Sequence, residues 1–178
     1  MKATIIELHK NTTPHPKLIY EYTTRQHYQL QISHTKKTLT AKLTLKPLPE
    51  PVKKEFQSEL FADHIEEPRA FAATLNNEPV GWIETGYEKW NNRIRIWELL
   101  VKNEHRRSGI GTQLMKHATQ TAKAKNARMI VLETQSYNVD AIQFYLAHSF
   151  ELIGFDTTAY SNQDIERGEI RLELGLKL

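Results

Sequence analysis

The spacing of apolar residues separates strand-like segments from helix-like segments along this chain. Between residues 28 and 45, apolar and polar positions alternate on both sides of a polar stretch at 34–37, which predicts two strands joined by a turn. Three more strands, antiparallel and joined by short turns, are predicted over residues 69–75, 80–88 and 93–101, because polar breaks separate these apolar runs.

A helix is predicted between these two groups of strands. Pro47, Pro49 and Pro51 interrupt the chain shortly before the segment 52–64. Apolar residues then recur near helical spacing, at Val52, Phe56, Leu60 and Ile65. The pattern predicts a helix that begins at about residue 52.

From residue 109 onward the apolar period becomes four residues. Ile110, Leu114, Ala118 and Ala122 share one face, and basic side chains collect near the far end of the segment, where a helix dipole favours cations. This predicts an amphipathic helix. It is followed by a buried strand over 129–132, a helix that Asn138 caps and that ends near residue 148, and strands over 150–155 and 169–178. Strands and helices together indicate a mixed α+β fold.

Composition narrows the class of protein. The chain has 178 residues, of which 39% are hydrophobic and 25% charged, and these values predict a single domain over residues 1–178. It has no cysteine, which excludes disulfides, a thiol nucleophile and thiolate-bound zinc. A net charge of +3 gives no support for a nucleic-acid partner. The apolar runs are too short for a membrane span and the N-terminus lacks a secretory pattern, so a cytoplasmic location is expected.

One strand, loop and helix junction indicates a phosphate site. Residues 101–112 read as the end of an apolar strand, a basic loop with the pattern Arg106-x-x-Gly109-x-Gly111, and the start of the helix. Such a junction directs backbone N–H groups and the positive end of a helix dipole at one point. The Rossmann and Walker patterns both fail on glycine spacing. The sequence therefore predicts a phosphate-bearing nucleotide cofactor of another class.

The loop resembles the acyl-CoA signature of the GNAT acetyltransferases, which is Arg/Gln-x-x-Gly-x-Gly/Ala. About thirty residues later the chain carries Leu132-Glu133-Thr134, Asn138, Ala141, Phe144-Tyr145, Phe150 and Gly154, which resemble the second conserved block of that family. The resemblance implies a GNAT fold, with a central mixed, mostly antiparallel sheet of about seven strands flanked by helices. It also implies that acetyl-CoA is the cofactor.

The resemblance assigns the cofactor site to the strand end, the loop and the second helix. The residues are Leu99, Val101, Arg106, Arg107, Ser108, Gly109, Ile110, Gly111, Thr112, Asn138, Ala141 and Tyr145. Asn138 is expected to cap its helix as well as to approach the cofactor. For at least one of the two arginines the alternative is a solvated loop side chain.

Within the family, residues 132–145, Asp156 and the stretch 160–162 are most similar to the streptothricin acetyltransferases. This implies an acceptor that is a primary amine of a small cationic antibiotic. The N-terminal half departs from that pattern, because it is basic at Lys36-Lys37 and Lys53-Lys54 where those enzymes carry an acidic, aromatic block. A protein N-terminal or lysine acetyltransferase and a non-catalytic CoA-binding module are the alternatives.

Acyl transfer to an amine needs a base, a polarised thioester and an acid for the departing thiolate, but no covalent enzyme intermediate. The resemblance and the chemistry of a phenol favour Tyr145 as the acid, with a core aromatic pair as its alternative. Glu98 is the candidate base because it interrupts an apolar strand, although a solvent-facing strand position explains it equally well. Glu84 is a weaker second candidate and is expected to face solvent.

Glu84, Asp156 and Tyr160 are assigned to the acceptor site, and for Asp156 and Tyr160 a strand-end turn is the alternative explanation. The eight histidines show no spacing typical of zinc, so no metal is expected. The alternating leucines of the last strand suggest a homodimer, with packing inside the sheet as the alternative.

Overall fold

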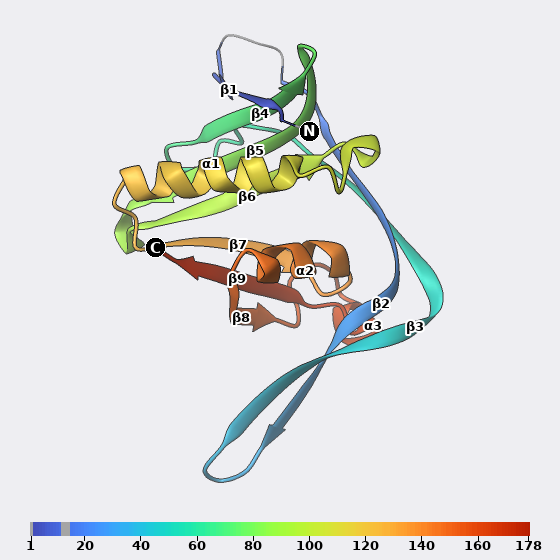
Figure 1. The fold of residues 1–178 in the computed structure, drawn as a ribbon. Coiled ribbons are helices and arrows are strands. Elements are labelled where there is room, and N and C mark those ends of the chain that lie inside the picture. The colour runs from blue at the N-terminus through green and yellow to red at the C-terminus, as the bar shows by residue number, and fades with distance from the viewer. Residues whose placement is uncertain (1, 12–14) are drawn as a thin grey trace. The chain divides into compact units, whose positions relative to one another are not determined.

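A computed structural model describes residues 2–11 and 15–178 of the chain. Its elements in chain order are β1 (Thr4–Leu8), β2 (Leu18–His34), β3 (Leu39–Ser58), β4 (Arg69–Leu75), β5 (Glu78–Glu88), η1 (Lys89–Asn91), β6 (Arg93–Val101), η2 (Asn103–His105), α1 (Ile110–Ala124), β7 (Met129–Gln135), α2 (Val139–Ala147), β8 (Glu151–Asp156), α3 (Asp164–Arg167) and β9 (Arg171–Lys177) (Figure 1).

The chain divides into two compact units. The first contains the described residues up to Tyr20 together with Phe56–Leu132 and Leu176–Leu178, and the second contains Glu21–Glu55 and Glu133–Gly175. β7 passes from the first unit to the second. The strand order is β1-β4-β5-β6-β7-β9-β8, and β2 and β3 form a separate two-stranded sheet.

The seven-stranded sheet is mixed. Pairing is antiparallel from β1 through β4 and β5 to β6, parallel between β6 and β7, and antiparallel between β8 and β9. This confirms the predicted mixed, mostly antiparallel sheet of seven strands with helices. No helix within residues 2–11 and 15–178 is long and apolar enough to cross a membrane.

In the first unit, α1 packs on one face of β4, β5 and β6 (Figure 1). The approach is closest at Gly81 of β5, where an added Cβ would lie 3.2 Å from Ile110 and 3.3 Å from Leu114 of the helix. The opposite face of these strands carries a separate apolar cluster. It is built from Leu18, Leu60, Phe61, Ala70, Ala72, Trp82 and Leu100. β5 is therefore covered on both faces.

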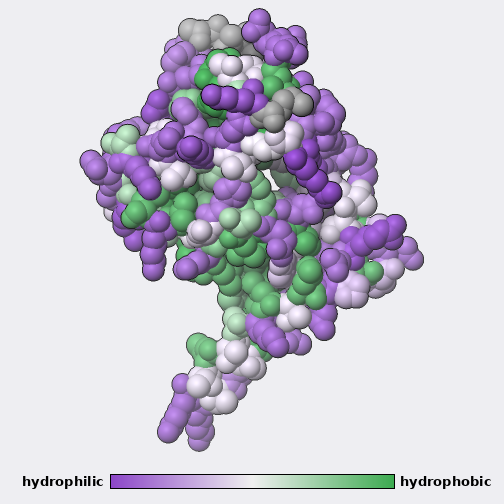
Figure 2. All heavy atoms as spheres, in the orientation of Figure 1, coloured by the Kyte–Doolittle hydropathy of each residue, from purple (hydrophilic) through white to green (hydrophobic). Residues whose placement is uncertain are grey.

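The second unit has its own small core. Ile142 of α2 packs with Ile170 and Leu172 near β9, and the partly buried Tyr28, Leu30 and Leu43 of the β2–β3 hairpin pack against them. The turn that joins β2 to β3 is exposed and carries two lysines, and Figure 2 shows hydrophilic side chains at this end of the hairpin.

The predicted helix over residues 52–64 is wrong, because β3 continues as a strand to Ser58. Val52 and Phe56 lie four residues apart, and this spacing places two residues on one face of a helix or of a strand alike. Prolines two residues apart also fit a strand of a two-stranded sheet, since their missing N–H groups all point to the same edge. The strands predicted between residues 28 and 45 are confirmed in type but are much longer.

Candidate active site

The two candidate carboxylates face each other across β5 and β6. In the antiparallel register Glu84 lies opposite Glu98, and the next pair is Thr85 with Ile96. Trp97 is thus an extra residue in β6, a β-bulge that interrupts the regular pairing. Strand residues directly opposite each other direct their side chains to the same face of the sheet. The carboxylates therefore belong to one cluster, on the face that lies opposite α1.

Glu98 is half-buried and accepts hydrogen bonds on both carboxylate oxygens. The Tyr20 hydroxyl donates to Oε2 at 2.5 Å, and the Ser58 hydroxyl donates to Oε1 at 2.5 Å. Burial raises the pKa of the Glu98 carboxyl, while the hydrogen bonds from Ser58 and Tyr20 oppose that shift because they stabilise the anion. The solvent-facing alternative for this side chain is wrong, because two neighbouring segments cover it.

Glu84 is completely buried, with 0% of the residue exposed. Its Oε1 accepts a hydrogen bond from the backbone N–H of Phe61 at 2.7 Å, whereas Oε2 has no hydrogen-bond partner among the described residues. Burial raises the pKa of Glu84 to about 7, and the negative charge of Glu98 adds to the shift, while the Phe61 N–H and the charge of Lys10 oppose it.

The expectation that Glu84 faces solvent is wrong. Alternation in an antiparallel strand predicts a wet face only where nothing covers that face, and here the apolar cluster around Trp82 and Leu100 does. Sequence reasoning missed Tyr20, Ser58 and Phe61, because these residues lie far from the carboxylates in the chain. Two of them follow the prolines, in the segment predicted to be helical.

The glycine loop has the backbone geometry expected of a strand-to-helix turn. Arg107 and Gly109 both have positive φ, at 59° and 85°, and α1 begins at Ile110 directly after Gly109. The first N–H groups of an α-helix have no partner within the helix, so α1 offers these donors at its start. A Cβ added at Gly109 would meet no atom within 4 Å. The loop thus leaves space beside the helix N-terminus.

Side chains of the same loop are partly committed to the loop itself. The Ser108 hydroxyl donates to the carbonyl of His105 at 2.5 Å, and Arg106 Nε donates to the carbonyl of Val101 at 3.4 Å. Arg106 and Arg107 are exposed. The loop therefore combines a folded backbone with two exposed cationic side chains.

In the second unit, the predicted cap is confirmed: the Asn138 side chain accepts a hydrogen bond from the N–H of Ala141 at 3.3 Å, at the start of α2. Tyr145 lies on the buried face of the same helix, with 8% exposed. Its ring contacts Phe144 edge-on at 5.5 Å and Phe150 at 5.8 Å. The phenol is thus held in place by aromatic packing, as the core interpretation expects.

Asp156 forms the turn that ends β8. Its Oδ1 accepts hydrogen bonds from the N–H of Thr158 at 2.8 Å and from the Thr158 hydroxyl at 2.9 Å, and these bonds lower its pKa. Its Oδ2 lies 3.5 Å from Arg171 Nη2. The strand-end turn that was the alternative explanation is therefore present.

Tyr160 is 37% exposed, and burial of its hydroxyl end, with the charge of Glu133 second, raises its pKa. The backbone N–H of Tyr160 donates to Asp164 Oδ2 at 2.6 Å, so this residue also takes part in a local turn.

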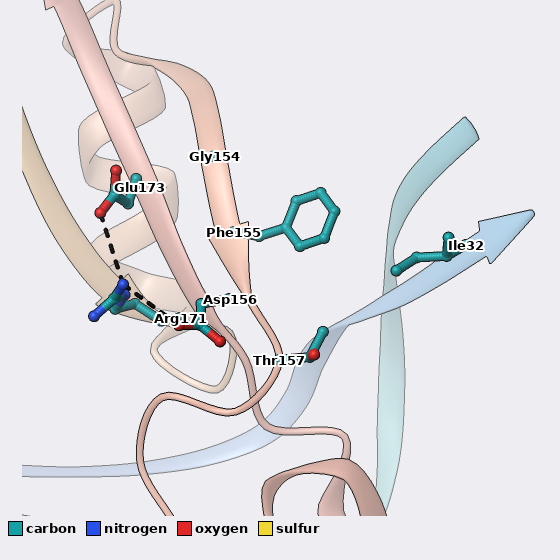
Figure 3. A pocket seen from close by; sticks show the side chains of 7 residues that line it. All are labelled: Ile32, Gly154, Phe155, Asp156, Thr157, Arg171 and Glu173. Atoms are coloured by element: carbon teal, nitrogen blue, oxygen red, sulfur yellow. Dashed lines mark ion pairs between the residues drawn. The ribbon is translucent and has the colours of Figure 1, made fainter. Parts of the chain in front are cut away.

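A pocket of about 440 Å³ lies beside the end of β8 (Figure 3). Figure 3 shows the Arg171 side chain between Glu173 and Asp156, with an ion pair to each. The lining residues are Ile32, Gly154, Phe155, Asp156, Thr157, Arg171 and Glu173. The pocket contains Asp156 but not Tyr160. Within the described part of the chain, no group of three or more histidine, aspartate or glutamate side chains is placed to hold a metal ion.

The acetyltransferase (GNAT) family model matches residues 6–150, which is most of the chain. The protein belongs to this family.

Among curated relatives, streptothricin acetyltransferase A of Bacillus subtilis (strain 168) is 36% identical over 93 residues, which cover 52% of this chain and 53% of that protein. The streptothricin acetyltransferase of Streptomyces lavendulae is 32% identical over 109 residues, which cover 61% of this chain and 57% of that protein. The chain thus spans little more than half the length of these curated relatives.

Among solved structures, a protein assigned as a streptothricin acetyltransferase from Bacillus anthracis str. Ames, in complex with acetyl coenzyme A, is 27% identical with a TM-score of 0.74. The similarity covers 100% of this chain and 98% of that one. A nourseothricin acetyltransferase is 26% identical with a TM-score of 0.70, over 93% of this chain and 99% of the other.

Proposed function

We propose that this protein is an acetyl-CoA-dependent N-acetyltransferase whose acceptor is a primary amine of a small cationic molecule of the streptothricin type. The observation that carries the proposal is the similarity, over the full length of the chain, to the Bacillus anthracis structure that holds acetyl coenzyme A. In this proposal residues 1–178 form one acetyltransferase domain, and the protein is expected in the cytoplasm.

We propose that the loop and the start of α1 hold the cofactor's phosphates. The backbone N–H groups from Arg107 to Thr112 are the donors, Arg106 and Arg107 supply positive charge, and the space beside Gly109 admits the ligand. The remaining cofactor residues stay as the sequence predicts them: Leu99, Val101, Ser108, Ile110, Gly111, Asn138, Ala141 and Tyr145.

The proposed reaction is direct transfer, in which the acceptor nitrogen bonds to the acetyl carbon as the carbon–sulfur bond breaks. Acetyl-CoA supplies the acetyl group and the thiolate leaving group. Glu98 accepts the proton that the acceptor's ammonium group must lose before it can attack, and the Tyr145 hydroxyl donates a proton to the sulfur. The second proton that the nitrogen loses as the amide forms restores the Tyr145 hydroxyl. No covalent intermediate on the protein is needed.

The acceptor is proposed to be cationic because the candidate acceptor residues are mostly acidic. Asp156 lies in the wall of the pocket. There its carboxylate and that of Glu173 both form ion pairs with the guanidinium of Arg171, so the wall holds two negative charges and one positive charge. Tyr160 follows on the same segment. Glu84 is kept as a third candidate, although its burial means that it must act through Glu98 rather than by touching the acceptor.

The test is release of free thiol from acetyl-CoA in the presence of a streptothricin, a polyamine or a peptide with a free N-terminus and a lysine. Turnover with the streptothricin alone is the expected result. Turnover with the peptide alone would replace this function with protein acetylation. Binding of CoA without turnover on any acceptor would indicate a non-catalytic module. The Glu98→Gln variant, which keeps the shape of the side chain, serves as the inactive control.

A homodimer stays a prediction. β9 lies between β7 and β8, and Leu172 and Leu174 are buried, so packing inside the sheet explains the alternating leucines of the last strand. Both edges of β9 are thus taken by strands of its own chain. Sedimentation at micromolar concentration will decide the oligomeric state, and a single monomeric species would exclude the dimer.

A further inference from the structure

Resting on the proposed function, we infer that Glu84 and Glu98 form a coupled carboxylate pair that shares one proton, held on Glu84. Glu84 is thus a positioning residue, which keeps Glu98 ionised and ready to take the acceptor's proton. This role follows from the contrast between the surroundings of the two side chains.

The two carboxylates differ in their hydrogen-bond donors. Both oxygens of Glu98 accept from hydroxyl groups, which stabilises this carboxylate as an anion. Glu84 accepts one backbone N–H, from Phe61, on Oε1, and its Oε2 is buried with no partner in the described chain. An unpartnered buried oxygen is costly as part of an anion and much less so in a neutral carboxyl group. The proton therefore belongs on Glu84.

The pairing of the strands places the two carboxylates beside each other. Because Glu84 and Glu98 are direct partners in the β5–β6 register, two negative charges would face each other on one side of the sheet. On its other side Glu84 is paired with Ala70 of β4, which brings no charge. The charge on one carboxylate makes ionisation of the other less favourable, so the pair loses its protons in two separate steps.

The charge of one cation acts on Glu84. Lys10, after β1, is the cation whose charge acts on Glu84, and its Nζ lies 2.8 Å from Asp63 Oδ1, with which it forms an ion pair. The Phe61 ring is covered by the His15 ring at a centroid distance of 4.6 Å. Since the nearby cation is already paired, the proton remains the means of neutralising Glu84.

The carboxyl groups can be titrated directly by NMR of protein labelled with ¹³C-carboxyl glutamate. We expect a carboxyl signal that titrates near neutral pH in the wild type and that disappears in Glu84→Gln. In Glu98→Gln the same signal should remain but titrate at lower pH, because the neighbouring charge has gone. The inference is overturned if no glutamate titrates near neutral pH, or if the neutral titration is lost in Glu98→Gln and kept in Glu84→Gln.

Kinetics test the positioning role. The amide in the Glu84→Gln variant imitates the protonated carboxyl group, so the loss of kcat/KM in this variant should be smallest at about pH 6. At about pH 8.5 the loss should be about threefold to tenfold larger, because the wild-type Glu84 ionises there and its charge strengthens Glu98 as a base.

Glu78→Gln, the same change at an exposed position of β5, is the matched control and should follow the wild type throughout. A loss in Glu84→Gln that is equal at all pH values would show a merely structural role and overturn the positioning role. The NMR titration needs no acceptor, so it decides the location of the proton even if the proposed activity is absent.

Discussion

Among single residues, Glu98 is one that the apolar pattern of its strand identifies, although the pattern does not identify its hydrogen-bond partners. The interruption of the apolar run identified this carboxylate, but its two hydroxyl donors could not be predicted. Tyr20 lies 78 residues away and Ser58 lies 40 residues away. Contacts over such separations depend on how the strands fold over the sheet, and no local pattern contains that information.

Removing one donor from Glu98 should raise the pH needed for activity. Tyr20→Phe keeps the ring, which stacks on Phe56 at 4.7 Å, but removes the hydroxyl that donates to the Glu98 anion. A hydrogen bond to a charged group contributes about 1.5–3 kcal/mol, so the acidic limb of the kcat/KM profile should move up by about one pH unit or more. Ser58→Ala should shift it in the same direction. Profiles that coincide with wild type in both variants would mean that Glu98 is not the base.

Tyr145→Phe separates catalysis from binding. The variant retains the aromatic packing with Phe144 and Phe150 and loses only the hydroxyl group. Turnover should fall by about 10²–10⁴ while the affinity for CoA, measured by calorimetry, stays within about twofold. Unchanged turnover would refute the proposed acid and support a purely structural aromatic pair. A large loss of CoA affinity would instead show that the hydroxyl holds the cofactor.

At the scale of elements, the sequence was most informative where the apolar period was long and undisturbed. The predicted strands at 69–75, 80–88 and 93–101 and both predicted helices after residue 109 are confirmed, with ends that differ by a few residues. β1 was missed because the apolar residues of Thr4–Leu8 do not alternate with polar ones and none of them is buried. The long β2–β3 hairpin was misjudged because much of it is exposed, so its apolar positions do not mark a buried face.

Gly109 links the loop to α1 through its backbone. Since φ is 85° and an added Cβ would meet nothing within 4 Å, Gly109→Ala is expected to strain the backbone without a steric clash. The left-handed conformation costs a non-glycine residue about 1–2 kcal/mol, so the loop should shift and CoA affinity should fall by about tenfold. Calorimetry with CoA measures the effect.

Gly154→Ala is the matched control for that experiment. The Cβ of this variant would lie 3.7 Å from Glu173, an ordinary contact, and Gly154 is not among the glycines with positive φ. It should bind CoA like wild type. Equal losses in the two variants would argue against a special role for the loop backbone.

At the scale of the whole molecule, a buried Glu84 links folding to pH. Folding raises the pKa of this carboxyl from 4.5 to about 7, so the folded chain binds the proton more tightly than the unfolded chain does. The stabilisation is complete below about pH 4.5 and is lost as the pH rises through 7. The raised pKa of Glu98 acts in the same direction. Carboxylates with lowered pKa, such as Glu88, lose their stabilisation only at more acidic pH and change little in this window.

The contribution of Glu84 to the free energy of unfolding should therefore fall between about pH 5 and pH 8, by up to about 3 kcal/mol. Urea denaturation at several pH values measures this slope. Glu84→Gln has no proton to lose at this position, so its curve should be markedly flatter, whereas Glu78→Gln should keep the wild-type slope. Parallel curves for wild type and Glu84→Gln would mean that the buried carboxyl keeps its ordinary pKa, because the fold would then gain nothing from holding the proton.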